Sequence, residues 1–104
     1  EAGAVSRARQ LAAELESEYE RHYYSGLIFE RRARALLHRT GHGRVQTAGE
    51  LLRDAMEAYE SADAVKPADN DDALLRWNAC ARLFQRHPEL MTVDEERTAP
   101  VMLE

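Results

Sequence analysis

Apolar and aromatic residues recur at steps of three and four along the first forty residues, which is the spacing of one face of an α-helix. They are Val5, Ala8, Leu11, Ala12, Leu15, Tyr19, Tyr23, Leu27, Ala33 and Leu37. The stretch contains no proline and is rich in good helix formers. The sequence therefore predicts a helix over about residues 4–40, either continuous or in two collinear halves that meet at Ser25-Gly26.

Gly41 is expected to end this helix, because glycine readily takes the left-handed conformation of a helix C-terminus. A second helix is predicted over about residues 47–66. Thr47 and Glu50 match a capping box, in which each side chain bonds the backbone amide of the other residue. Pro67 should stop this helix, because the residue before a proline is disfavoured in the helical region.

A third helix is predicted over about residues 70–87. Asp69 or Asn70 is expected to cap its N-terminus, and Pro88 should end it. Residues 1–88 then form a single domain, and residues 89–104, rich in acids, are expected to be an extended or mobile tail. The residues predicted to form the core of the second and third helices are Leu51, Ala55, Tyr59, Ala62, Leu74, Trp77, Ala81 and Phe84.

The predicted helix lengths do not match. A helix of about 36 residues is roughly 54 Å long, about twice the length of either other helix. Neighbours joined by short loops are antiparallel, so the second helix can cover only the C-terminal half of the first. Either the chain folds back near Gly26 to make a fourth helix, or another copy of the chain covers the exposed apolar face. The lack of a strong turn signal between Tyr23 and Leu27 favours self-association.

The predicted helical hairpin resembles a tetratricopeptide repeat. Ala55, Tyr59, Ala62 and Pro67 reproduce the small, aromatic, small and proline positions of the second helix of that repeat. The segment LLRDAMEAYESADAVKP is similar to this half-repeat, and ALLRWNACARLF is similar to a following first helix. Upstream the match fails at residues 41–43, so at most one and a half repeats are present. The resemblance implies an all-α fold that binds a protein or peptide.

The charge distribution argues against a general nucleic-acid binder. The chain has a net charge of −5, and its acidic groups are concentrated after residue 45. A basic surface is needed to displace the counterions of a nucleic acid. One local cluster is basic, and it consists of Arg31, Arg32, Arg34, Arg39 and Arg44. This cluster is expected to be a solvated helix face, with an anion-binding patch as the alternative.

The sequence contains no recognisable catalytic or metal-binding constellation. Cys80 is the single cysteine, so neither an internal disulfide nor a cysteine metal cluster is expected. His38 and His42 are four residues apart, but Gly41 and Gly43 should break the helix between them, so solvent-facing histidines are predicted. We therefore expect no enzyme activity and no cofactor.

The sequence shows neither an apolar run of membrane-spanning length nor an N-terminal leader, so a cytoplasmic protein without membrane contact is expected. Because the chain begins at Glu1 rather than Met, we expect it to be a processed or trimmed product.

The sequence therefore predicts an all-α bundle of three, or with a fold-back four, antiparallel helices, with a long first helix. The predicted function is a non-enzymatic interaction or scaffolding module that binds a protein or peptide and forms a homodimer. The residues expected to line its binding surface are Tyr19, Tyr23, Tyr24, Phe29, Arg31 and Arg34. The alternative is a small regulatory domain that binds an anionic or phosphorylated ligand through the Arg31–Arg44 cluster.

Overall fold

The computed structural model describes residues 2–39 and 44–91. Helix α1 spans Ala2–Leu37, α2 spans Arg44–Ala64 and α3 spans Asp72–Arg86, and residues 88–91 add one helical turn. Neither described range contains a strand. The predicted all-α class with a long first helix is confirmed, and α1 continues without interruption through Gly26.

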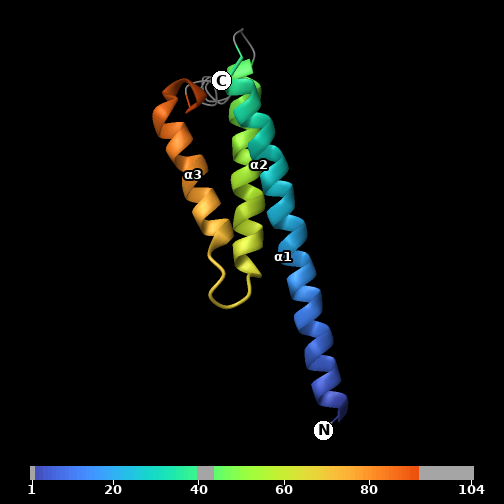
Figure 1. The fold of residues 1–104 in the computed structure, drawn as a ribbon. Helices are drawn as coiled ribbons and strands as arrows, with labels where there is room; N and C mark the ends of the chain where they lie inside the picture. Colours follow the sequence, from blue (N-terminus) through green and yellow to red (C-terminus); the bar gives the residue numbers. More distant parts are fainter. Residues whose placement is uncertain (1, 40–43, 92–104) are drawn as a thin grey trace, which may run out of the picture.

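Each helix runs antiparallel to the one before it along the chain (Figure 1). Helix α2 lies between α1 and α3 and packs against both. The 36 residues of α1 make a helix roughly 54 Å long, against roughly 32 Å for the 21 residues of α2. The molecule is accordingly elongated, with extents of 61 × 35 × 18 Å. The N-terminal half of α1 therefore extends well past the end of α2 (Figure 1).

The buried core lies where α2 faces its two neighbours. Tyr59 is its largest fully buried side chain and sits close against the backbone of Gly26. The other buried apolar residues are Tyr19, Ala33, Ala48, Leu52, Ala55, Ala62, Ala73, Cys80, Leu83, Phe84 and Leu90. Leu51 and Trp77 are only partly buried against this cluster. Small residues on α2 let the neighbouring helices approach closely, with Tyr59 filling the space between them.

The first two helices begin and end differently from the prediction. Helix α1 ends at Leu37, where the amides of His38 and Arg39 bond carbonyls only three residues back and tighten the last turn. Gly41 lies outside the described residues. Helix α2 begins at Arg44, so Thr47 lies inside its first turns and is not the residue that caps it. Packing explains the earlier start, because Val45 contacts the core and Ala48 is buried.

Helix α3 and the residues after it also depart from the prediction. The N-cap residue of α3 is Asp71 and not the predicted Asp69 or Asn70, and its side chain makes no capping bond, so the helix starts two residues later than predicted. Asp69 takes a left-handed conformation with φ of 67°, and the side chain of Asn70 accepts the amide of Asp72 at 3.0 Å. After Arg86, residues 88–91 form a helical turn rather than an extended tail. Leu90 in that turn is buried against Gly49 of α2, and this contact explains the turn. Residues 92–104 lie outside the described part of the chain.

The face that α3 buries is rotated from the predicted one. Leu74 is exposed and Ala81 is only partly buried, whereas Ala73, Cys80 and Leu83 are buried. One residue on a helix corresponds to a rotation of about 100°. This rotation places Arg76 on the side facing α1, where it bonds a buried carboxylate. Pairing of that buried charge therefore outweighs burial of the larger Leu74 side chain.

Candidate interaction surface

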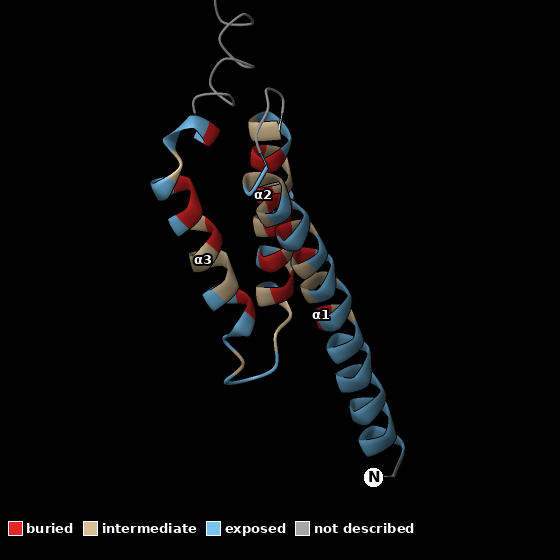
Figure 2. Cartoon of the chain, turned by 45° about the horizontal axis from the view of Figure 1, so that its top comes forward, coloured by how far each residue is buried: buried red, intermediate tan, exposed pale blue. Residues whose placement is uncertain are grey.

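The N-terminal half of α1 carries an apolar face that no other part of the described structure covers. Residues 3–17 are all exposed (Figure 2), including Val5, Leu11 and Leu15, whose exposed fractions are 49%, 57% and 41%. We call Val5, Ala8, Leu11, Ala12 and Leu15 the uncovered face. Single exposed apolar side chains are ordinary, but a continuous helical stripe of them is typical of a binding surface.

The uncovered face continues the face of α1 that α2 covers. From Leu15 the same three-and-four spacing leads to Tyr19, Gly26, Glu30 and Ala33, all of which are buried. Apart from Glu30, one side of α1 is therefore free of charged residues along nearly its whole length, but α2 reaches only the C-terminal part. The uncovered face thus has the composition of a helix-packing surface that lacks its second helix.

The tyrosines expected to line the binding surface have different surroundings. Tyr19 is buried, and its hydroxyl donates to Oδ1 of Asn70 at 3.3 Å. Tyr23 stacks on Tyr19 with ring centroids 5.7 Å apart and also contacts the ring of Tyr59. Tyr24 is 58% exposed. Tyr19 and Tyr23 thus close the end of the core nearest the uncovered face, and Tyr24 lies at the surface beside them.

The other three predicted contact residues are not gathered into one surface. Phe29 is partly buried and lines a shallow hollow between α1 and α2 together with His22 and Asp54. Arg31 is exposed. Arg34 is half-buried and its guanidinium bonds the Glu30 carboxylate. Arg34 is therefore engaged in a structural contact.

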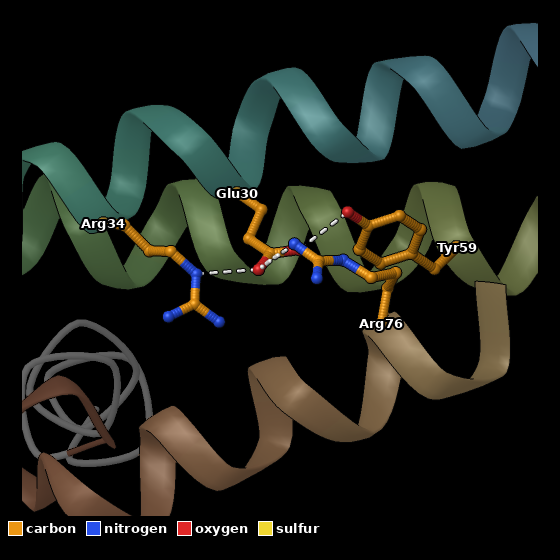
Figure 3. A network of polar contacts seen from close by, with 4 residues as sticks. All are labelled: Glu30, Arg34, Tyr59 and Arg76. Carbon is orange, nitrogen blue, oxygen red and sulfur yellow. Dashed lines mark hydrogen bonds and ion pairs between the residues drawn. The ribbon is translucent and has the colours of Figure 1, made fainter. Parts of the chain in front are cut away.

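Glu30 is the fully buried charged residue of the described core, and it joins all three helices (Figure 3). Its carboxylate accepts the Tyr59 hydroxyl of α2 at 2.7 Å, Nε of Arg34 at 2.7 Å and a terminal guanidinium nitrogen of Arg76 from α3 at 2.8 Å. A buried carboxylate is costly unless it is paired and hydrogen-bonded. Here both oxygens are satisfied, so the network sets which face of each helix turns inward.

The sequence contains a signal for this network, which is a charged residue on the apolar face of a predicted helix. The apolar stripe of the first helix takes a step of six residues from Leu27 to Ala33, and Glu30 stands midway between them. A charged residue on the buried face of a helix requires a partner of opposite charge. Arg76 stands three residues after Ala73 and four before Cys80, which places it on the buried face of the third helix.

Burial of the Tyr59 hydroxyl and the Cys80 thiol is expected to make the stability of the fold decrease at high pH. Burial, together with the hydrogen bond to the Glu30 carboxylate, raises the pKa of the Tyr59 hydroxyl well above its usual range. Burial first, and the nearby Glu30 charge second, raise the pKa of the Cys80 thiol to about 12. The folded chain thus keeps protons that the unfolded chain releases, so stability is complete below the unfolded pKa values and is lost as pH rises through the folded ones.

We therefore expect the free energy of unfolding to fall above about pH 9, by about 1.4 kcal/mol per pH unit for each group that is protonated only in the folded state. Urea unfolding followed by circular dichroism at a series of pH values measures this slope. Tyr59→Phe should reduce the slope above about pH 10. A profile that stays flat up to about pH 11, or an unchanged slope in Tyr59→Phe, would contradict this explanation.

A second hollow lies at the opposite end of the molecule, where α1 and α3 both end. It has a volume of about 260 Å³ and is lined by Arg34, Leu37, His38, Leu83, Arg86 and His87. Of the predicted arginine cluster, only Arg34 lines it. Arg31, Arg32 and Arg39 are exposed on α1 or just beyond it, and Arg44 is half-buried at the start of α2. The hollow is basic, but it lies beside two helix C-termini, whose negative dipole ends oppose an anion.

Within the described residues, no group of three or more His, Cys, Asp or Glu side chains could hold a metal ion. His38 is exposed, and His42 lies outside those residues. Over the same ranges, no helix combines the length and apolar character needed to cross a membrane. Cys80 is buried.

Comparison with known proteins finds no matching family model, curated protein or solved structure. The resemblance to the tetratricopeptide repeat stays a prediction.

Proposed function

We propose that this chain is a non-enzymatic protein–protein interaction module that self-associates through the uncovered face of α1. The observation that carries the proposal is the continuation of one apolar helix face for about four turns beyond the helix that covers it. Amphipathic helices that bind other proteins use such stripes, in which apolar residues three or four positions apart contact the partner. A helix of another polypeptide chain, laid along this face, would extend the packing that α2 begins.

Two further features support an interaction role. A helical segment of about fifteen residues without tertiary contacts is only marginally stable in water, so a covering partner would stabilise the N-terminal half of α1. The buried Glu30 network fixes α1 rigidly against α2 and α3. The uncovered face is therefore continuous with a helix whose C-terminal half is anchored in the core, so only its N-terminal half remains to be ordered on binding.

Two glutamates placed on the uncovered face should abolish self-association. In Leu11→Glu with Leu15→Glu, two apolar anchors become charges that a partner helix would have to desolvate. Light scattering on a sizing column is expected to give a dimer mass for the unchanged chain at high concentration and a monomer mass for the variant. Circular dichroism should show the same helix content in the core, because both positions lie outside it.

The matched control is Gln10→Glu with Ser17→Glu. These two exposed residues lie on the opposite side of α1 and change the net charge equally. The control should associate like the unchanged chain. A monomer mass for the unchanged chain at every concentration, or equal loss in the control, would overturn self-association through this face.

A second candidate function is binding of an anionic or phosphorylated ligand, for which the basic hollow between the ends of α1 and α3 is the supporting feature. Titration with a short polyphosphate, followed by amide shifts around His38, would test it. Binding should weaken steeply with salt and be reduced in Arg86→Gln but not in Arg82→Gln, an exposed position on the same helix. Absence of shifts, or an equal effect of the two substitutions, would exclude this site.

A further inference from the structure

The charges beside the uncovered face indicate what covers it. Resting on the proposed function, we infer that the occupant is the same segment of a second copy, running antiparallel, so that the N-terminal halves of two α1 helices form a symmetric pair. This pairing has a defined direction, a centre near Ala12 and charged residues that select it, none of which self-association alone requires.

The charges of this segment are separated along the helix. Arg7 and Arg9 lie near its start, and Glu14, Glu16 and Glu18 follow about one heptad later, with all five residues exposed or half-exposed. A parallel pair would set the arginines beside arginines and the glutamates beside glutamates. An antiparallel pair sets each basic end beside the acidic part of the other copy. Opposite charges in register favour one orientation of a helix pair over the other.

One pair of residues has the most direct geometry. Arg9 and Glu16 are seven residues apart, so both lie on the same flank of the uncovered face. In an antiparallel two-helix pair each flank faces the same flank of the other copy. Centred near Ala12, such a pair brings Arg9 of each copy to Glu16 of the other. The twofold axis makes this ion pair occur twice.

The length of the uncovered face also fits this arrangement. With the pair centred near Ala12, Val5 of the incoming helix reaches the level of Tyr19. At the level of Tyr19, α1 begins to be covered by the rest of its own chain, because the Tyr19 hydroxyl bonds Asn70 of the α2–α3 connection. The exposed Asp72, whose charge acts on the Tyr19 hydroxyl, also lies there and would face the basic start of the incoming helix. The second copy would thus occupy the free length of α1 without displacing α2.

The size of the pair predicts reversible association. Residues 3–17 give a contact roughly 22 Å long, which is short for a two-helix interface. Such a contact buries less than the ~1,600 Å² of a standard protein–protein interface. A monomer–dimer equilibrium that depends on protein concentration is therefore expected, not a permanent dimer.

A charge exchange in the full-length chain tests the direction of pairing. Arg9→Glu places two acids together in each antiparallel contact, and Glu16→Arg places two bases together, so the dissociation constant of each variant should rise by about tenfold or more. An equimolar mixture of the two variants restores both ion pairs and should dimerise about as tightly as the unchanged chain. Sedimentation equilibrium over about a hundredfold range of concentration measures all three.

Disulfide trapping gives an independent reading of the orientation. Ala12→Cys, near the proposed twofold axis, should form a covalent dimer under mild oxidation, whereas Val5→Cys should not, because its counterparts lie far apart in an antiparallel pair. The unchanged chain is the control, since its Cys80 is buried.

The outcomes separate this inference from the proposed function. Efficient trapping of Val5→Cys, or a variant mixture that stays monomeric while the unchanged chain dimerises, would overturn the antiparallel pairing and leave self-association standing. An unchanged chain that is monomeric throughout would overturn both.

Discussion

Gly26→Ala is expected to destabilise the fold by about 1 to 3 kcal/mol, although alanine is the better helix former. A Cβ atom at this position would lie 2.4 Å from Cε1 and 2.6 Å from Cδ1 of the Tyr59 ring. Contacts that short cannot exist, so either the ring must turn or α1 must move away from α2. Tyr59 is fully buried and bonded to Glu30, so either movement disturbs the core and its polar network. Urea unfolding followed by circular dichroism measures the loss.

Gly3→Ala is the matched control for this prediction. It is the same substitution in the same helix, but the nearest atom to its Cβ is the end of the flexible Arg7 side chain, at 3.5 Å. A neutral or slightly stabilising effect is expected there, up to about 1 kcal/mol. Adding Tyr59→Leu to Gly26→Ala should cost less than the sum of the two single changes, because a smaller side chain relieves the contact. Equal effects at Gly26 and Gly3 would contradict the close approach of α1 and α2.

These energetics explain which parts of the fold were readable in the sequence. The apolar spacing of α1 and the stop before Pro67 are local signals, and they placed the helices and the all-α class. The sequence leaves the continuity of α1 through Gly26 open, since a glycine in a helix can mark either a break or a close contact. The residue packed against Gly26 decides between a break and a close contact. That residue is Tyr59, which lies 33 residues away, so local sequence does not identify it.

The orientation of α3 shows why the rest could not be read from spacing. Leu74 and Ala73 offer two alternative apolar stripes that differ by one residue, and side-chain size alone favours burial of Leu74. The structure buries Ala73 instead, because that rotation brings Arg76 to Glu30. A prediction that assigns every charged residue to the protein surface cannot anticipate that Arg76 faces the core. The uncovered face of α1, by contrast, followed from helix lengths alone, since α2 is too short to reach it.

Glu30→Ala is expected to destabilise the chain by about 2 to 4 kcal/mol. The substitution leaves the buried Tyr59 hydroxyl without its acceptor and removes the charge that holds Arg34 and Arg76. Removing one member of a buried ion pair can cost about 3 to 5 kcal/mol. The expected value is lower because the side chains of Arg34 and Arg76 are each 40% exposed and can turn towards water. Urea unfolding at neutral pH measures the loss.

A double-mutant cycle with Tyr59→Phe separates the hydroxyl bond from the ion pairs. If the buried hydroxyl carries part of the cost, Tyr59→Phe should be less damaging in the Glu30→Ala background than in the unchanged chain, by about 1 kcal/mol. Glu20→Ala, at an exposed position of the same helix, should change stability by less than about 0.5 kcal/mol. Strictly additive effects of Glu30→Ala and Tyr59→Phe would mean that the hydroxyl bond contributes nothing. The rotation of α3 would then be left to the Arg76 ion pair and to packing.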